Sequence, residues 1–375
     1  MKVLITGANG FVGKNLQLHL AARQDVQVVC FTRSDDVVQL PALLRDVDFV
    51  FHLAGVNRPQ DPQDFIVGNV DLTLALCRAV CEVADATGKK VPIVYTSSIH
   101  AERDNLYGES KRQAEVALLA VAKSHQVPMH IFRLPNVFGK WCKPNYNSAV
   151  ATFCHNIARG LPIQVSDPAA AVTLVYVDDV IERLVQLMDG SDAAVCAEGF
   201  ATVAAQYTTT VGELARQIQV FKDSRATLMT ERVGAGLVRA LYATYVSYLP
   251  VELFAYQVPQ YRDPRGVFVE MLKTPDAGQF SFFTAYPGIT RGGHYHHSKT
   301  EKFLVIKGQA RFRFRHMQTC QLHELVTTGD TSEIVETVPG WTHDITNIGD
   351  TEMVVMLWAN EIFDRARPDT FSCPL

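Results

Sequence analysis

Residues 2–13 read KVLITGANGFVG, a short β-branched run followed by glycines at Gly7, Gly10 and Gly13. The run predicts a buried strand, and the glycines permit a tight turn into a helix expected at Val12–Arg23. The backbone N–H groups and the dipole at the start of such a helix favour a pyrophosphate. The spacing G-x-x-G-x-x-G departs from the commoner G-x-G-x-x-G, but its place between a strand and a helix predicts a dinucleotide site.

The alternation of strand and helix patterns continues to about residue 200. Further strands are expected at Val26–Phe31, Phe49–His52, Ile93–Ser97 and Met129–Leu134, and helices at Phe65–Ala86 and Tyr107–His125. This order is typical of a parallel sheet wrapped by helices, an α/β fold of the Rossmann type.

The pattern changes in the last third of the chain. A final helix is expected at Gly236–Leu249, followed by Pro250 and the segment YQVPQYRDPRG. Beyond Tyr261 the helical patterns disappear, and short strands punctuated by Gly and Pro predict an all-β barrel or sandwich. Strands are expected at Phe280–Ala285, Phe303–Ile306, Ala310–Phe314 and Met353–Leu357. We therefore expect two domains, residues 1–252 and 253–375.

The composition excludes several classes of function. The 375 residues carry 35 Lys and Arg against 39 Asp and Glu, so a basic surface for nucleic acid is not expected. No run approaches the about 18 apolar residues of a membrane span, and we expect a cytoplasmic protein without membrane contact. The eight cysteines form no C-x-x-C pair, which predicts reduced thiols rather than disulfides or a thiolate zinc site.

Arg33 bears on the choice of cofactor. An acidic residue about 20 positions beyond the glycines commonly binds the ribose 2′-OH of NAD. Here Arg33 stands 20 residues after Gly13, and a guanidinium favours a 2′-phosphate instead. We therefore expect NADPH rather than NADH, the alternative being that Arg33 is an ordinary solvent-facing loop residue. Leu53, Ala54 and Gly55 follow another strand, beside the expected path of the cofactor.

A serine, a tyrosine and a lysine form a second pattern. Thr96, Ser97 and Ser98 end a strand, and Tyr107 and Lys111 stand four residues apart at the start of a helix. Tyr and Lys at this spacing share one helical face, so the ammonium can lower the pKa of the phenol. Such a tyrosine can exchange a proton with an alcohol or ketone oxygen while a nicotinamide exchanges hydride with its carbon. The alternative is an ordinary amphipathic helix start.

The motifs GANGFVG, HLAG, YTSS, YGESK, RLPNVFG (133–139) and VYVDDV (175–180) together resemble the extended short-chain dehydrogenase/reductase family. The resemblance implies a Rossmann domain with a small sugar-binding lobe, acting on nucleotide-activated sugars. It implies that Tyr107 is the acid/base, that Lys111 holds the nicotinamide ribose, and that Ser98, rather than Ser97, binds the sugar oxygen. The Thr-Asp-Glu of the family's dehydratases is absent, which leaves ketone reduction or 4-epimerisation. The expected cofactor contacts are Gly7, Asn9, Gly10, Phe11, Val12, Gly13, Thr32, Arg33, Leu53, Ala54, Gly55, Tyr107 and Lys111.

Histidines dominate a third pattern, in the β region. His294 and His296 project from the same face of an expected strand, and Glu301 and His343 can reach them from neighbouring strands. Three neutral imidazoles and a carboxylate suit Zn, Fe, Mn, Ni or Cu. The residues themselves do not indicate which of these metals binds.

Residues 288–308 read G-x5-H-x-H-x4-E-x6-G, which is similar to the first motif of the cupin family. A second motif around His343 and Asn347 has one residue fewer between its proline and glycine than is usual. The resemblance implies a cupin barrel that holds one divalent metal, with zinc as the first expectation. His294, His296, Glu301 and His343 are its implied ligands, and His297 is the reserve ligand.

Arg311, Arg313 and Arg315 alternate with phenylalanines along one strand, so the three guanidinium groups share a face. That face is either solvated or a diphosphate-binding surface inside the mouth of the barrel.

A reductase followed by a cupin resembles a group of bifunctional enzymes that make capsular polysaccharide and O-antigen precursors. The resemblance implies a UDP-sugar substrate, UDP-2-acetamido-2,6-dideoxy-hexos-4-ulose. The cupin would invert C3, and the reductase would use NADPH to convert the C4 ketone into the alcohol of a UDP-6-deoxy-L-talosamine derivative, towards UDP-N-acetyl-L-fucosamine. A homodimer or higher homo-oligomer is expected as well.

The C3 chemistry is coherent by itself, because a C4 ketone acidifies the C3 proton and a base can invert that centre through an enolate. His297, Tyr295 and Asp344 are open candidates for this base. Two other functions stay open: a reductase whose metal-binding cupin is not catalytic, and a redox-neutral 4-epimerase whose cupin acts on something else.

Overall fold

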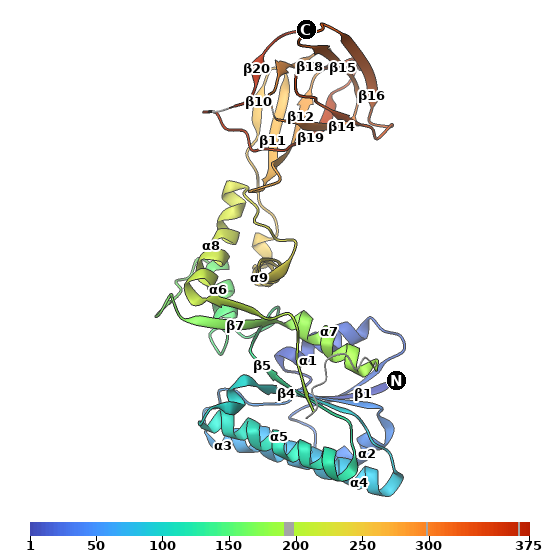
Figure 1. The fold of residues 1–375 in the computed structure, drawn as a ribbon, viewed down its shortest axis with the longest axis vertical. Coiled ribbons are helices and arrows are strands. Elements are labelled where there is room, and N and C mark those ends of the chain that lie inside the picture. The colour runs from blue at the N-terminus through green and yellow to red at the C-terminus, as the bar shows by residue number, and fades with distance from the viewer. Residues whose placement is uncertain (191–198, 298, 367) are drawn as a thin grey trace. The chain divides into compact units, whose positions relative to one another are not determined.

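The computed structural model describes residues 1–190, 199–297, 299–366 and 368–375 (Figure 1). The chain divides into two compact units. The N-terminal unit comprises Met1–Ile218 and Ala240–Leu249, and the C-terminal unit comprises Gln219–Arg239 and Pro250–Leu375. The domain boundary predicted between residues 252 and 253 stays a prediction. None of the described helices has the length and apolar character needed to cross a membrane.

A six-stranded parallel sheet forms the centre of the N-terminal unit, in the order β2-β1-β3-β4-β5-β8. The order changes direction between β1 and β3, and such a switch point opens a crevice at the carboxyl ends of the strands. These strands are β1 (Lys2–Thr6), β2 (Gln27–Phe31), β3 (Phe49–His52), β4 (Ile93–Ser98), β5 (Met129–Leu134) and β8 (Phe200–Ala201). The α/β expectation is confirmed, and β1, β3 and β5 have the expected bounds.

Helices cover both faces of this sheet (Figure 1). The apolar sides of α2, α4 and α5 pack on one face, in a core that includes Leu44, Leu76, Tyr95 and Leu118. The helices are α1 (Phe11–Ala21), α2 (Leu40–Asp46), α3 (Gln63–Phe65), α4 (Leu72–Thr87), α5 (Leu106–His125), α6 (Ala149–Ala158), α7 (Val177–Met188), α8 (Val211–Thr227) and α9 (Gly236–Ser247), and a π-helical segment, η2 (Ile66–Asp71), precedes α4. A smaller sheet contains β6 (Asn136–Phe138), β7 (Ala171–Tyr176) and β9 (Tyr207–Thr210).

Two antiparallel sheets make up most of the C-terminal unit, in the orders β10-β11-β12-β19-β14-β17 and β16-β15-β18-β13-β20. Phe283 and Val355 from the first sheet share a core with Phe312 and Ile345 from the second. The strands are β10 (Tyr261–Asp263), β11 (Gly266–Lys273), β12 (Gln279–Ala285), β13 (Thr290–Tyr295), β14 (Glu301–Lys307), β15 (Gln309–His316), β16 (Leu322–Thr328), β17 (Ile334–Glu336), β18 (Trp341–Asn347), β19 (Met353–Ala359) and β20 (Phe371–Ser372). The all-β expectation agrees with these sheets, and a closed cupin barrel stays a prediction.

The arginine row on β15 lies on the outer face of its sheet. Phe312 and Phe314 are buried in the core, so the alternating Arg311, Arg313 and Arg315 face away from it. Arg313 pairs with Asp344 of β18, with 2.5 Å between Nη2 and Oδ2. A diphosphate-binding face inside the barrel mouth was therefore the wrong alternative for these arginines.

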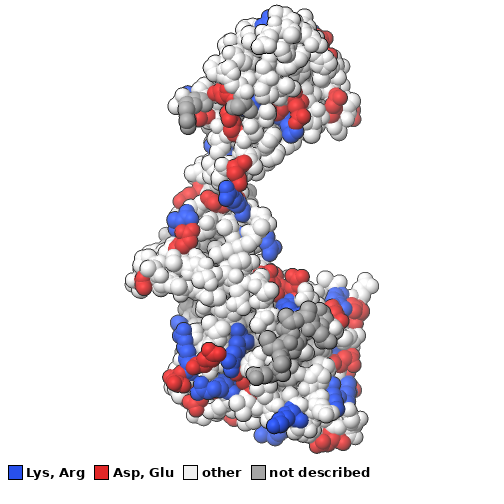
Figure 2. All heavy atoms as spheres, viewed as in Figure 1, with Lys and Arg blue, Asp and Glu red and all other residues white. Residues whose placement is uncertain are grey.

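The distribution of surface charges and the state of the cysteines agree with the expectations from the composition. On the face shown in Figure 2, acidic and basic side chains lie intermixed. All seven cysteines that the structure describes are free thiols, whereas Cys196 lies outside the described residues.

Candidate functional sites

The glycine turn after β1 packs closely against the backbone around it. Gly7 has φ +70°, and a Cβ on it would lie 2.6 Å from the Ala54 backbone. A Cβ on Gly13 would lie 2.4 Å from the Gly7 carbonyl oxygen, so both positions require glycine. Gly10 caps α1 without a side-chain hydrogen bond, and the first turn contains no acidic residue. The helix start therefore offers N–H groups to an anion.

The turn after β3 closes the switch point. Leu53 N–H donates to the Thr6 carbonyl at 3.2 Å, which places Leu53, Ala54 and Gly55 against the glycine turn. A Cβ on Gly55 would lie 3.1 Å from Lys111 Nζ, so this turn also touches the Ser-Tyr-Lys group. The structure thus brings the expected cofactor residues of β1, β3 and α5 to one edge of the sheet.

Arg33 lies in the turn after β2 and is exposed. Thr32, beside it, donates its backbone N–H and its hydroxyl to Asp35 Oδ2 at 2.7 and 2.8 Å. The turn is therefore held by Thr32 and Asp35, and the Arg33 side chain is exposed at the end of the strand where an adenosine ribose binds in such folds.

Tyr107 and Ser98 face each other at the end of β4. Asn105 caps α5 by accepting the Gly108 N–H at 2.9 Å, which fixes the first turn of the helix and with it Tyr107. Burial raises the pKa of the Tyr107 phenol, and the hydrogen-bonding Ser98 side chain lowers it in part. The expected lowering by Lys111 does not appear, because the ammonium points elsewhere.

Lys111 is buried and donates to two oxygens on β4. Its Nζ lies 3.2 Å from the Tyr95 hydroxyl and 3.1 Å from the Thr96 carbonyl. Burial lowers the pKa of the Lys111 ammonium to about 8, although the Glu115 charge raises it in part. Sequence reasoning missed Tyr95, and its position two residues before the strand-end serines was the available signal.

Ser97 has a different partner from Ser98. Its hydroxyl donates to Glu115 Oε1 at 2.5 Å, and Glu115 also pairs with Arg133, with 2.6 Å between Oε2 and Nη2. Glu115 is 2% exposed. Ser97 thus belongs to a buried structural pair, and Ser98 is the serine beside Tyr107.

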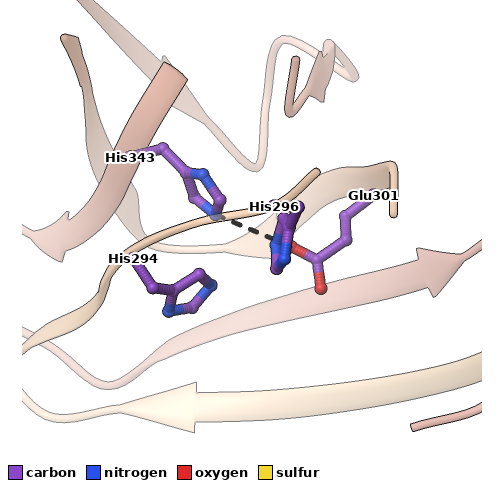
Figure 3. A group of neighbouring side chains, drawn as sticks. All are labelled: His294, His296, Glu301 and His343. Atoms are coloured by element: carbon purple, nitrogen blue, oxygen red, sulfur yellow. Dashed lines mark hydrogen bonds and ion pairs between the residues drawn. The ribbon is translucent and has the colours of Figure 1, made fainter. Parts of the chain in front are cut away.

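The four expected metal ligands converge in the C-terminal unit (Figure 3). His294 lies on β13, His296 just after it, Glu301 at the start of β14 and His343 on β18. One nitrogen or oxygen from each side chain lies within 4.8 Å of the corresponding atoms of the other three. His297, the reserve ligand, is not part of this group.

The donor set fits a divalent cation. Both ring nitrogens of His343 are buried without a hydrogen bond among the described residues, Nε2 lies 3.6 Å from Glu301 Oε2, and a metal would satisfy one of the two nitrogens. Burial lowers the pKa of His294 to about 4, so its imidazole is neutral at pH 7. Burial raises the pKa of Glu301, but His296, His343 and the Lys299 ammonium lower it below its usual range. Neutral imidazoles and an ionised carboxylate are the forms that bind metal.

The three candidates for the C3 base, Asp344, Tyr295 and His297, have different partners in the structure. The Asp344 carboxylate pairs with Arg313 on the outer face of the sheet, so it is not a candidate. The rings of Tyr295 and His297 pack on Phe371, with centroids 5.4 and 4.8 Å away.

Two further residues reach the cluster and were missed from the sequence. Lys299 is 7% exposed, and its Nζ lies 3.2 Å from Glu301 Oε1. The Asp369 carbonyl accepts a hydrogen bond from His296 Nδ1 at 2.7 Å. Lys299 lies inside the histidine motif, which was a usable signal, whereas nothing near Asp369 marks it.

Comparison with known proteins gives matches to both units. Residues 3–200 match the sequence model of the NAD dependent epimerase/dehydratase family, and residues 261–371 match that of the polysaccharide biosynthesis C-terminal domain. A UDP-2-acetamido-2,6-beta-L-arabino-hexul-4-ose reductase from Pseudomonas aeruginosa is 61% identical over 374 residues, which cover 100% of this chain and 98% of the relative.

Solved structures agree with these matches. The crystal structure of the capsular polysaccharide assembling protein CapF from Staphylococcus aureus has 42% identity and a TM-score of 0.91, with 100% of both chains covered. A Bacillus cereus UDP-glucuronic acid 4-epimerase with NAD has 17% identity and a TM-score of 0.54, covers 66% of this chain and 98% of its own, and shows a shared fold alone. The chain therefore belongs to the NAD dependent epimerase/dehydratase family and is a CapF-like member of it.

Proposed function

We propose that this protein is a bifunctional nucleotide-sugar enzyme. Its C-terminal unit epimerises C3 of UDP-2-acetamido-2,6-dideoxy-hexos-4-ulose, and its N-terminal unit reduces the C4 ketone to the UDP-6-deoxy-L-talosamine derivative, towards UDP-N-acetyl-L-fucosamine. Two contacts carry the reductase: Ser98 hydrogen-bonds Tyr107, and Lys111 lies against Gly55 in the turn that packs on the glycine turn. The reductase activity for which the Pseudomonas relative is named supports the same reduction.

In the reductase, NADPH supplies a hydride when it is bound. Tyr107 then gives its phenolic proton to the C4 oxygen of the sugar, and Ser98 donates a hydrogen bond to the same oxygen. The Lys111 ammonium, held near Gly55 by β4, would bind the nicotinamide ribose. The glycine turn and the start of α1 would bind the pyrophosphate, and Arg33 would pair with the 2′-phosphate.

In the epimerase, His294, His296, Glu301 and His343 hold one divalent metal, with zinc as the first expectation. When bound, it supplies Lewis-acid stabilisation of negative charge on an enolate oxygen. A base takes the C3 proton, with Tyr295 and His297 as the remaining candidates, and a proton returns to the opposite face. Because this step is reversible, the following reduction removes the epimer and draws the sequence forward.

Exchange of the C3 proton tests the proposal. The UDP-4-keto sugar is incubated in D2O with and without NADPH, and loss of the C3–H signal is followed by NMR. We expect exchange without NADPH that survives Tyr107→Phe and disappears in His294→Ala. Exchange that is absent from the wild type would overturn the C3 epimerase and leave a reductase with a non-catalytic metal module. Turnover at C4 without net NADPH consumption would instead indicate the 4-epimerase.

The cofactor and the assembly have separate tests. Arg33→Ala is expected to raise KM for NADPH and to leave KM for NADH unchanged, and equal effects on both would refute the pairing with a 2′-phosphate. The expected homodimer or higher homo-oligomer is tested by light scattering of the full chain.

A further inference from the structure

A segment far along the chain reaches the metal cluster and has no part in the proposed chemistry. Residues 368–375, here called the clamp segment, contain β20, which pairs with β13 through His294 with Ser372 and Tyr295 with Phe371. Cys373 N–H donates to the Gly293 carbonyl at 2.8 Å and extends this pairing. The clamp segment therefore lies directly along β13, which carries His294 and leads into His296.

Asp369 determines which ring nitrogen of His296 can bind a metal. The main-chain carbonyl of Asp369 lies 2.7 Å from His296 Nδ1. A carbonyl oxygen can only accept a hydrogen bond, so Nδ1 carries the proton. The other ring nitrogen, Nε2, lies 3.2 Å from Glu301 Oε2 inside the cluster, so it is the nitrogen that a metal between the four ligands would contact. The tautomer of His296 thus follows from the position of one carbonyl group.

The Asp369 carboxylate holds that carbonyl in place. Its Oδ1 accepts the His297 N–H at 3.0 Å, and its Oδ2 accepts the Lys299 N–H at 2.9 Å. One side chain thereby fixes the turn between two ligands, His296 and Glu301, and ties it to the clamp segment. Asp369 has φ +33°, a left-handed conformation that a non-glycine residue adopts only when its surroundings hold it there.

We propose that Asp369 is a positioning residue of the metal site, which sets the tautomer of His296 and strengthens metal binding. The inference rests on the proposed function, because it requires His294, His296, Glu301 and His343 to bind a metal. Hydrogen bonds to the free nitrogen of a ligand histidine orient the ring and raise its basicity, and their removal typically weakens metal affinity by roughly 10- to 100-fold.

The test compares three variants of the full chain loaded with Zn²⁺ or Co²⁺. Asp369→Gly removes both carboxylate contacts, yet it suits the left-handed backbone, so backbone strain is not added. Asp369→Asn keeps the size and can accept only one of the two N–H groups. Ser372→Ala, at an exposed position on β20, is the matched control. Affinity is measured by competition with a chromogenic chelator, and ligand geometry by the visible absorption of the Co²⁺ protein.

We expect Zn²⁺ affinity to fall roughly 10- to 100-fold in Asp369→Gly, less in Asp369→Asn, and not at all in Ser372→Ala. The Co²⁺ absorption should change in Asp369→Gly, whereas a merely structural role would lower the melting temperature and leave the spectrum of the folded protein unaltered. Unchanged affinity and spectrum in both Asp369 variants would overturn the inference alone. A wild-type protein that binds neither metal would overturn the proposed metal site itself.

Discussion

Replacing Lys111 with methionine should change how stability depends on pH. Burial lowers the pKa of Lys111 from its ordinary 10.5 to about 8 in the folded protein. Between these two values the unfolded chain retains a proton that the folded protein has released, so the stability of the wild type rises with pH over this window. At 1.36 kcal/mol per pKa unit, the gain between pH 7.5 and 9.5 is about 2 kcal/mol.

Urea unfolding at several pH values measures this effect. Circular dichroism at 222 nm follows the helices, which belong largely to the N-terminal unit. The difference in unfolding free energy between wild type and Lys111→Met cancels the titration of all other groups. Between pH 7.5 and 9.5, we expect the unfolding free energy of the wild type to rise by about 2 kcal/mol relative to that of the variant. Lys123→Met, at an exposed lysine of the same helix, controls for the loss of one charge. A difference that stays constant with pH for Lys111→Met would refute the reasoning.

Three further changes have defined outcomes. Gly13→Ala should abolish NADPH binding, measured by cofactor fluorescence, because the new Cβ would fall 2.4 Å from a carbonyl oxygen, whereas Gly234→Ala, with nothing within 4 Å, should bind normally. Glu115→Ala should lower the free energy of unfolding by about 2 kcal/mol, since Ser97 and Arg133 lose their buried partner while the partly exposed Arg133 keeps Glu102; a loss below about 1 kcal/mol in urea unfolding would contradict this. His343→Ala should bind less Zn²⁺ than wild type by elemental analysis, and equal metal content would remove His343 from the ligand set.

Local sequence patterns predicted the N-terminal unit well. β1, β3 and β5 follow from short apolar runs bounded by turns, because a buried parallel strand needs a continuous apolar segment. The glycine turn was predictable, since Gly7 and Gly13 stand where any side chain would collide with backbone. The direction of the Lys111 ammonium was not, because it depends on Tyr95, which meets the helix only after β4 and α5 have packed.

The metal cluster was predictable because three of its ligands lie close together in the sequence and share a strand face or a turn. Asp369 was not, since β20 joins β13 by a pairing that no local pattern encodes. The outward direction of Arg313 follows from strand alternation only once Phe312 and Phe314 are known to fill the core. The positions of such side chains depend on strand pairings between residues that are distant in the sequence.

The position of β19 in the six-stranded sheet has a consequence for folding kinetics. β19 lies between β12 and β14, so Phe283 and Val305 both pair with Val355, which lies much further along the chain. Until β19 docks, β12 and β14 each present an unpaired edge to other molecules. Pairings between residues so distant in sequence form slowly, because the intervening loop must close first. We therefore expect the metal ligands to assemble late in refolding, and the yield of refolded protein to fall as its concentration rises.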